Sequence, residues 1–177
     1  MATSTLTASR PGAARLAGWW PLFAALASAA MLAAAHAFET FGGYAPCALC
    51  LRQREVYWAA LAIALAGMVV IRLKTRLAPL VDVLLATAFF CGAGVAAYHA
   101  GVEWKWWPGP TSCTGLGGTI TTDALTGLLE GAKARPPACD EAAWRLLGVS
   151  MAGYNFLISL GLCVLGVAAA VSRRPQP

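Results

Sequence analysis

The sequence predicts an all-α integral membrane protein: a bundle of four transmembrane helices with two loops on the outer side. Three observations lead to this prediction. Hydrophobic residues make up 59% of the 177 residues and charged residues 12%, whereas a soluble domain carries about 25% charged residues. Four apolar runs are close to the roughly 20 residues that cross a bilayer. The basic residues lie at the ends of these runs, which argues for membrane topology and against nucleic-acid binding.

Each apolar run is expected to form one helix, because a backbone in lipid must satisfy its own hydrogen bonds. The expected spans cover about residues 16–38, 56–71, 78–98 and 146–171. They leave short tails at 1–15 and 173–177, a membrane domain over 16–172, and two outer loops at 39–55 and 99–145. The second run is the shortest, but the residues around Leu51 can extend its helix outward.

The charges orient these spans. Seven basic residues share one side with no clear acidic partner: Arg10, Arg15, Arg72, Lys74, Arg76, Arg173 and Arg174. The opposite side carries basic and acidic residues in similar number, while Asp82 lies just inside the third span. Because cytoplasmic loops are rich in Lys and Arg, both termini are predicted to be cytoplasmic and the two long loops to lie outside.

A cleaved signal peptide is the alternative reading of the first span, because Ala35-His36-Ala37 resembles a small-x-small cleavage site. The apolar stretch is about 20 residues long, whereas the apolar region of a signal peptide has about 7–15. Its length therefore favours a retained helix.

The six cysteines carry the most functional information. Cys91 and Cys163 fall inside predicted spans, where a cysteine usually acts as a small apolar residue. The other four lie in the outer loops: Cys47 and Cys50 in the first, Cys113 and Cys139 in the second. The outer face of a bacterial inner membrane is oxidising, so two static structural disulfides are one interpretation.

Three details favour redox chemistry instead. The Cys47-x-x-Cys50 spacing closes a very small ring, which constrains the unfolded chain little and is common in thiol exchange. The pair precedes a membrane helix, whose N-terminus favours a thiolate. Arg54 lies one helical turn beyond Cys50, and His99 ends the third span on the same side. Snorkelling of Arg54 to the headgroups and an interfacial His99 without a role are the simpler alternatives. We expect no metal, because oxidation competes with zinc for these cysteines.

The chain resembles the disulfide bond formation protein B (DsbB) family over about residues 16–172. The matching residues are Pro46-Cys47-Ala48-Leu49-Cys50, Gln53-Arg54, Cys113, Cys139, Trp144 and the Gly148…Asn155 entry to the last span. The combination of these motifs is specific, although no single one would be. Vitamin-K-epoxide-reductase-like enzymes perform similar chemistry, but they generally place the loop pair before the Cys-x-x-Cys, which is opposite to this chain.

The resemblance implies a thiol:quinone oxidoreductase of the bacterial inner membrane with its active site on the periplasmic side. Cys113 would form a mixed disulfide with a soluble, DsbA-like thioredoxin-fold partner, and Cys139 would pair with Cys47 in an intermediate. Cys50 would face the quinone, ubiquinone or menaquinone, as a thiolate beside Arg54. His99 lies near the position of a quinone-site histidine in the family. The implied partners are therefore this dithiol oxidase, membrane lipid and quinone, with no nucleic acid.

Overall fold

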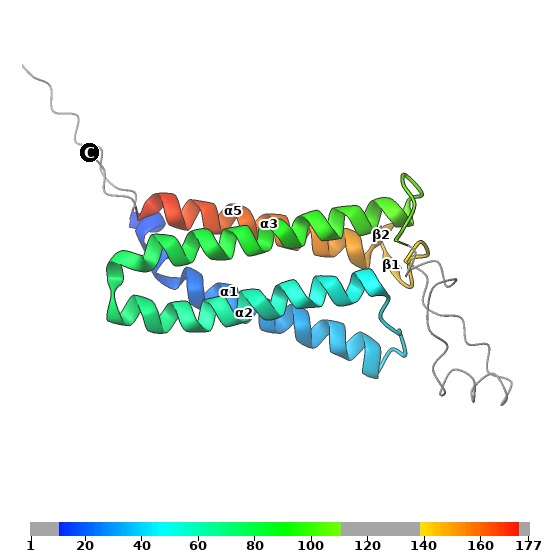
Figure 1. The fold of residues 1–177 in the computed structure, drawn as a ribbon, viewed down its shortest axis with the longest axis horizontal. Coiled ribbons are helices and arrows are strands. Elements are labelled where there is room, and N and C mark those ends of the chain that lie inside the picture. Colours follow the sequence, from blue (N-terminus) through cyan, green and yellow to red (C-terminus); the bar gives the residue numbers. More distant parts are fainter. Residues whose placement is uncertain (1–10, 111–138, 174–177) are drawn as a thin grey trace, which may run out of the picture.

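The computed structural model describes residues 11–110 and 139–173, and within them four long helices run side by side (Figure 1). The helices are α1 (Pro11–Thr40), α2 (Ala48–Leu73), α3 (Ala78–Glu103) and α5 (Met151–Ser172). A 3₁₀ turn, η1 (Thr75–Leu77), joins α2 to α3. Helix α2 packs against α1 and α3, and α5 packs against α3 and α1, so the four helices form a closed bundle.

All four helices are long and apolar enough to cross a membrane. The qualifying segments are Ala17–Thr40, Ala48–Leu73, Thr75–Glu103 and Met151–Ser172. Most of their large apolar side chains point outward, as is expected of helices surrounded by lipid, whereas Trp20, Leu85 and Phe89 are fully buried between them. The predicted four-helix membrane bundle is therefore confirmed.

The helices extend beyond the spans that hydropathy predicts. Helix α2 begins at Ala48 and not near residue 56, so Cys50 and Arg54 are helical residues and not loop residues. Helix α3 continues to Glu103, which places His99 inside the bundle one turn before the helix end. Charged residues end an apolar run in the sequence, but they do not interrupt the backbone hydrogen bonds of a helix.

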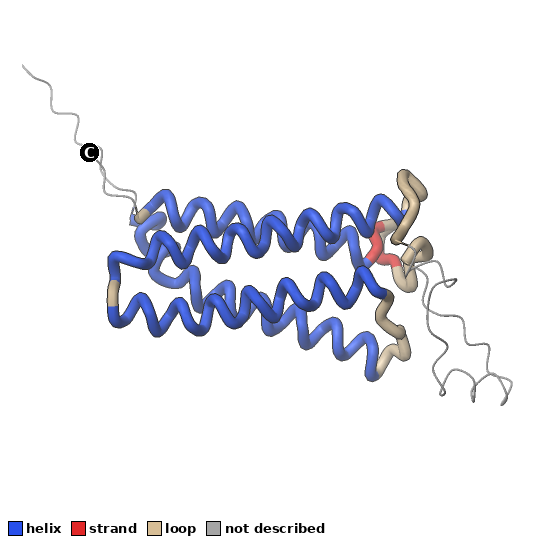
Figure 2. Tube along the Cα trace, viewed as in Figure 1, coloured by secondary structure: helices blue, strands red, loops and turns tan. Residues whose placement is uncertain are grey.

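A short hairpin precedes the last helix, where the sequence predicted that the span already begins at residue 146. Strands β1 (Arg145–Leu146) and β2 (Val149–Ser150) pair in antiparallel fashion (Figure 2). Leu147 and Gly148 form the turn with positive φ angles of 51° and 81°. Helix α5 then begins at Met151, because the Ser150 hydroxyl accepts a hydrogen bond from the Gly153 amide at 3.2 Å.

The two ends of the bundle are chemically different. Residues 41–47, 104–110 and 139–150 lie together at one end, which we call the cysteine end (Figure 1). At the other end, Arg173 Nε donates to the fully buried Asp82 carboxylate at 2.6 Å. Arg173 also donates to the Ala17 carbonyl. This pair compensates a buried charge and ties α1, α3 and α5 together.

Candidate active site

Cys47 and Cys50 occupy the N-terminus of α2 at the cysteine end. Cys47 is the N-cap residue, and its Sγ accepts a hydrogen bond from the Cys50 amide at 3.3 Å. The two Sγ atoms are 2.9 Å apart, and both residues are free thiols. The first turn of α2 therefore holds two sulfur atoms close enough to join, in the positive field of a helix N-terminus.

The two thiols are not equivalent. Cys47 is buried and donates its S–H to Cys50 Sγ, whereas Cys50 is partly exposed. This hydrogen bond, together with burial, raises the pKa of the Cys47 thiol well above its ordinary value. Cys47 therefore keeps its proton, and negative charge in the pair belongs on Cys50. The positive charge of Arg54 acts on the same sulfur.

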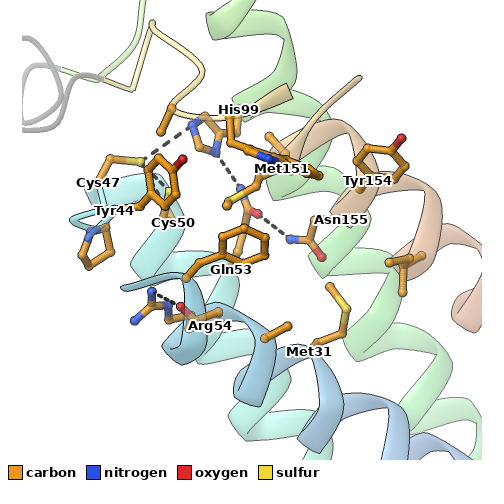
Figure 3. A pocket seen from close by; sticks show the side chains of 18 of the residues that line it. Met31, Tyr44, Cys47, Cys50, Gln53, Arg54, His99, Met151, Tyr154 and Asn155 are labelled. Atoms are coloured by element: carbon orange, nitrogen blue, oxygen red, sulfur yellow. Dashed lines mark hydrogen bonds between the residues drawn. The ribbon is translucent and has the colours of Figure 1, made fainter. Parts of the chain in front are cut away.

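His99 connects the cysteine pair to a polar interior. Its Nε2 atom lies 3.7 Å from Cys47 Sγ, and its Nδ1 atom lies 2.8 Å from Gln53 Nε2 (Figure 3). Because the Gln53 amide nitrogen can only donate, Nδ1 accepts this hydrogen bond and the ring proton is on Nε2. The ring is 4% exposed, so His99 presents an N–H to the buried sulfur and not to solvent.

The orientation of Gln53 is set in turn by α5. Asn155 Nδ2 donates to Gln53 Oε1, and the Asn155 carbonyl accepts hydrogen bonds from Tyr57 at 2.5 Å and from Ser159 at 3.3 Å. All four of these side chains are buried, and Tyr57 and Ser159 are also 2.9 Å apart. The hydrogen bonds run in one direction from the hydroxyl groups to His99. A buried chain that is satisfied in this way holds each side chain in a single arrangement.

Arg54 lies beside the pair, and its guanidinium is directed at α1. Its side chain is 15% exposed, and its guanidinium pairs with Glu39 at 2.5 Å and donates to the Ala35 carbonyl at 3.1 Å. Both contacts are on α1. The sequence left snorkelling open, and the observed burial and pairing favour a cation fixed at the site.

A cavity of about 370 Å³ lies between the pair and the bundle interior. Cys47, Cys50, Gln53, Arg54 and His99 all line it (Figure 3). The rest of the wall is mostly apolar and includes Met31, Leu32, Phe38, Trp144, Met151 and Ile158. A mostly apolar cavity with a few converging polar groups is typical of a small-molecule site.

Glu103 is a further polar group of this cavity, and the sequence analysis assigned it no role. It is the last residue of α3, its side chain is 5% exposed, and its Oε1 atom lies 3.8 Å from His99 Nε2. The Ser150 hydroxyl is its hydrogen-bond partner, whereas the Oε2 atom has none among the described residues. One carboxylate oxygen is therefore buried in the cavity wall without a hydrogen-bond partner among the described residues.

Cys139 brings the second outer loop to the same place. It is fully buried, packs with Cys47, Leu49 and Val102, and is disulfide-bonded. Its backbone forms a hydrogen bond with His99. Close by, Lys105 pairs with Asp140 at 2.5 Å and thereby lowers the pKa of this carboxyl. Cys113, the fourth predicted site cysteine, lies outside the described residues.

Comparison with protein families agrees with this geometry. The family model described as disulfide bond formation protein DsbB matches residues 17–169. The chain belongs to the DsbB family. No curated protein and no solved structure matches it significantly. As a member of this family, the chain is a multi-pass membrane oxidoreductase of disulfide bond formation.

The structure of this DsbB-family chain brings five predicted site residues to one cavity wall or its edge: Cys47, Cys50, Arg54, His99 and Cys139. The ligand atoms of Cys47, Cys50 and His99 lie within 4.8 Å of one another, so a soft metal ion has three candidate ligands there. Structural zinc sites use four ligands, and a thiol pair at this spacing suits disulfide chemistry better.

The other two cysteines do not belong to this site. Cys91 is exposed on the outer surface of α3, and Cys163 is half-buried on α5 beside the apolar core. Both are free thiols. Their interpretation as small apolar residues stays the simplest one.

Proposed function

We propose that this protein is a thiol:quinone oxidoreductase that reoxidises a periplasmic, DsbA-like dithiol oxidase and passes the electrons to a membrane quinone. One observation carries the proposal: a Cys-x-x-Cys pair at a helix N-terminus opens onto a mostly apolar cavity and packs against a buried cysteine of the second outer loop. This arrangement joins a water-facing thiol partner to a lipid-soluble oxidant.

The electrons move through two successive thiol–disulfide exchanges. Cys113 receives the partner's attacking thiolate in a mixed disulfide, and the Cys113–Cys139 pair becomes reduced as the partner is oxidised. A thiolate of Cys139 then attacks Cys47 of the Cys47–Cys50 disulfide, which lies in the same buried cluster, and Cys50 leaves as a thiolate. Cys113 next attacks Cys139, which re-forms the Cys113–Cys139 disulfide and releases Cys47. Exchange proceeds best when the leaving thiol ionises easily, and the helix N-terminus and Arg54 favour charge on Cys50.

The cavity suits a quinone head group. Its volume falls within the range of about 300–1,000 Å³ typical of ligand sites, and its wall is largely apolar. Arg54 would hold one polar end of the ring, ubiquinone or menaquinone, next to Cys50, and His99 would line the site beside the cysteine pair. The quinone supplies a two-electron acceptor, so re-forming the Cys47–Cys50 disulfide needs no metal. A fixed cation at this depth would stabilise negative charge on a quinone oxygen.

The positive-inside rule supports a location in the bacterial inner membrane, with the cysteine end on the periplasmic side. Basic residues gather near the opposite end, at Arg72, Lys74, Arg76 and Arg173. The periplasm is the compartment in which disulfides form and persist.

A structural membrane subunit with two static disulfides is the competing function. The Cys47 and Cys50 sulfur atoms lie 2.9 Å apart at a helix N-terminus with the positive charge of Arg54 acting on Cys50, and this environment favours a redox-active pair. The buried polar chain that runs through Asn155 and Gln53 to His99, beside the Cys47 sulfur, is also not expected in a subunit with only static disulfides.

Capture of the thiol partner tests the proposal. In Cys139→Ala, Cys113 is a free thiol that can attack the disulfide of an oxidised partner. The resulting mixed disulfide has lost its internal escape route, so a covalent adduct with a thioredoxin-sized partner should accumulate on non-reducing gels. Cys113→Ala should form no adduct, and Cys91→Ala, outside the site, should behave as the wild type. A folded Cys139→Ala protein that captures no partner would contradict the proposal.

A further inference from the structure

Glu103 has a chemical environment that the proposed relay does not use. A carboxyl group is rarely buried without full pairing, yet this side chain is 5% exposed and its Oε2 atom has no hydrogen-bond partner among the described residues. It lines the same cavity as Cys50 and His99. This buried acid shares a cavity with both thiols and is therefore a candidate for a role in their chemistry.

Proton balance identifies what the site lacks. When the Cys50 thiolate and the Cys47 thiol join, one S–S bond forms, the Cys47 S–H bond breaks, and two electrons pass to the quinone, whose oxygens must gain two protons. One of these protons comes from solvent, because Cys50 is already ionised and partly exposed. The Cys47 proton starts on a buried sulfur, so it needs a carrier inside the protein.

We propose that Glu103 carries this proton: it accepts the proton of the Cys47 thiol as the disulfide forms and delivers it to the quinone oxygen in the cavity. The inference rests on the proposed function. Cys47 Sγ and Glu103 Oε1 lie 3.7 and 3.8 Å from the same atom, His99 Nε2. A general base acts within hydrogen-bond reach or through one water, and both atoms are close to the same ring nitrogen of His99.

His99 is the positioning residue in this arrangement. The hydrogen bond from Gln53 keeps its Nδ1 atom occupied as an acceptor, so His99 cannot itself take the thiol proton at Nε2. Its Nε2–H is held by the Cys139 backbone and lies 3.7 Å from the Cys47 sulfur, with the Glu103 carboxylate 3.8 Å from the same nitrogen. Because the polar chain from α5 leaves His99 without a free nitrogen lone pair, Glu103 is the residue that can act as the base.

The charged and titratable groups around Glu103 come from several elements. His99 faces it from α3, Cys50 interacts with it from α2, and Arg145 interacts with it from β1. The Ser150 hydroxyl contacts the carboxylate but does not titrate in the working range. A proton on Glu103 is thus exchanged between a thiol side and a cavity side without direct contact with bulk water.

The test separates the quinone step from the partner step in the full-length protein. Reduced protein is mixed rapidly with a short-chain quinone, and Cys47–Cys50 disulfide formation is followed with time. Glu103→Gln keeps the shape and loses the proton-carrying group, so the rate should fall about 100-fold or more. Thiol exchange with the partner should keep its rate. Glu55→Gln, which removes an exposed acid paired with Arg52 on α2, is the matched control.

Chemical rescue distinguishes a proton carrier from a structural residue. Glu103→Ala should regain quinone reduction when formate is added, because formate fits the vacated space and carries a proton, whereas chloride should not restore it. An infrared difference spectrum of the wild type should also show a carboxyl protonation signal upon disulfide formation, shifted in Glu103→Asp.

The outcomes are distinct. A wild-type protein that does not reduce quinone overturns the proposed function itself. A wild-type protein that does so, with an unchanged rate in Glu103→Gln, overturns only the role of Glu103. If both substitutions impair folding, a wild-type infrared spectrum without a carboxyl change overturns it as well.

Discussion

Asn155→Leu should separate the structural contribution of the polar chain from its contribution to activity. Asn155 has three buried partners, Tyr57, Ser159 and Gln53, and leucine can bond none of them. Tyr57 and Ser159 remain 2.9 Å apart and can satisfy each other. The second hydroxyl hydrogen can turn to the backbone carbonyl of residue 155, one helical turn before Ser159. The Gln53 carbonyl oxygen then remains as one unsatisfied buried acceptor.

The expected loss of stability follows from that count. An unsatisfied buried acceptor costs about 1–3 kcal/mol, whereas hydrogen bonds between membrane helices average about 0.6 kcal/mol. We therefore expect the free energy of unfolding to fall by about 1–2 kcal/mol. The activity should fall further, because a released Gln53 no longer fixes His99, and a misplacement of about 1 Å can cost about 10²-fold in rate.

Equilibrium unfolding in detergent and the quinone reduction rate measure these two effects. Ser159→Ala is the matched control: it removes the 3.3 Å bond to Asn155 and the 2.9 Å contact with Tyr57, and it leaves the Tyr57–Asn155 bond of 2.5 Å and the Gln53–Asn155 bond in place. It should change neither quantity much. If Asn155→Leu loses stability but retains the full quinone rate, the chain only supports the fold and does not orient His99.

Three further predictions concern the site and its topology. Arg54→Met should slow quinone use by about 10²–10³-fold without slowing partner exchange, and Arg54→Lys should be intermediate because it keeps a point charge. Steady-state rates against quinone concentration measure both effects. Normal quinone kinetics in Arg54→Met would mean that Arg54 has only a structural role. A single cysteine introduced next to Lys74 should resist labelling by an impermeant reagent from outside, and strong labelling would reverse the topology. In the reduced protein, iodoacetamide should modify Cys50 before Cys47, because hydrogen bonding and burial raise the pKa of the Cys47 thiol; the reverse order on peptide mapping would refute this assignment.

Hydropathy and motif spacing predicted the four helices and most of the site, because both depend on residues that are local in the sequence. Cys47 and Cys50 are three residues apart, and Arg54 follows on the same helix face. Helix ends were less accessible, since Arg52 and Glu55 lower the hydropathy of a first turn that is still helical.

The interior polar chain could not be derived from spacing. Gln53 and Asn155 are about 100 residues apart, and only the packing of α2 against α5 shows that their amides meet. Glu103 looked like one of several acids in an outer loop, because the sequence does not reveal that helix α3 continues as far as Glu103. Asn155 carried a signal, because a polar residue within an apolar run is a candidate for function, whereas Gln53 and Glu103 fell in the predicted outer loops.

The redox state of the cysteines under controlled quinone supply tests the central claim most directly. The purified protein, placed in vesicles without oxygen, is given a reduced thioredoxin-fold dithiol and either no quinone or an excess of it. The account predicts that Cys47 and Cys50 stay reduced without quinone and become disulfide-bonded with it, with one quinol formed for each partner disulfide. Cysteines that stay oxidised whatever the quinone supply would contradict the relay and identify a structural subunit with static disulfides.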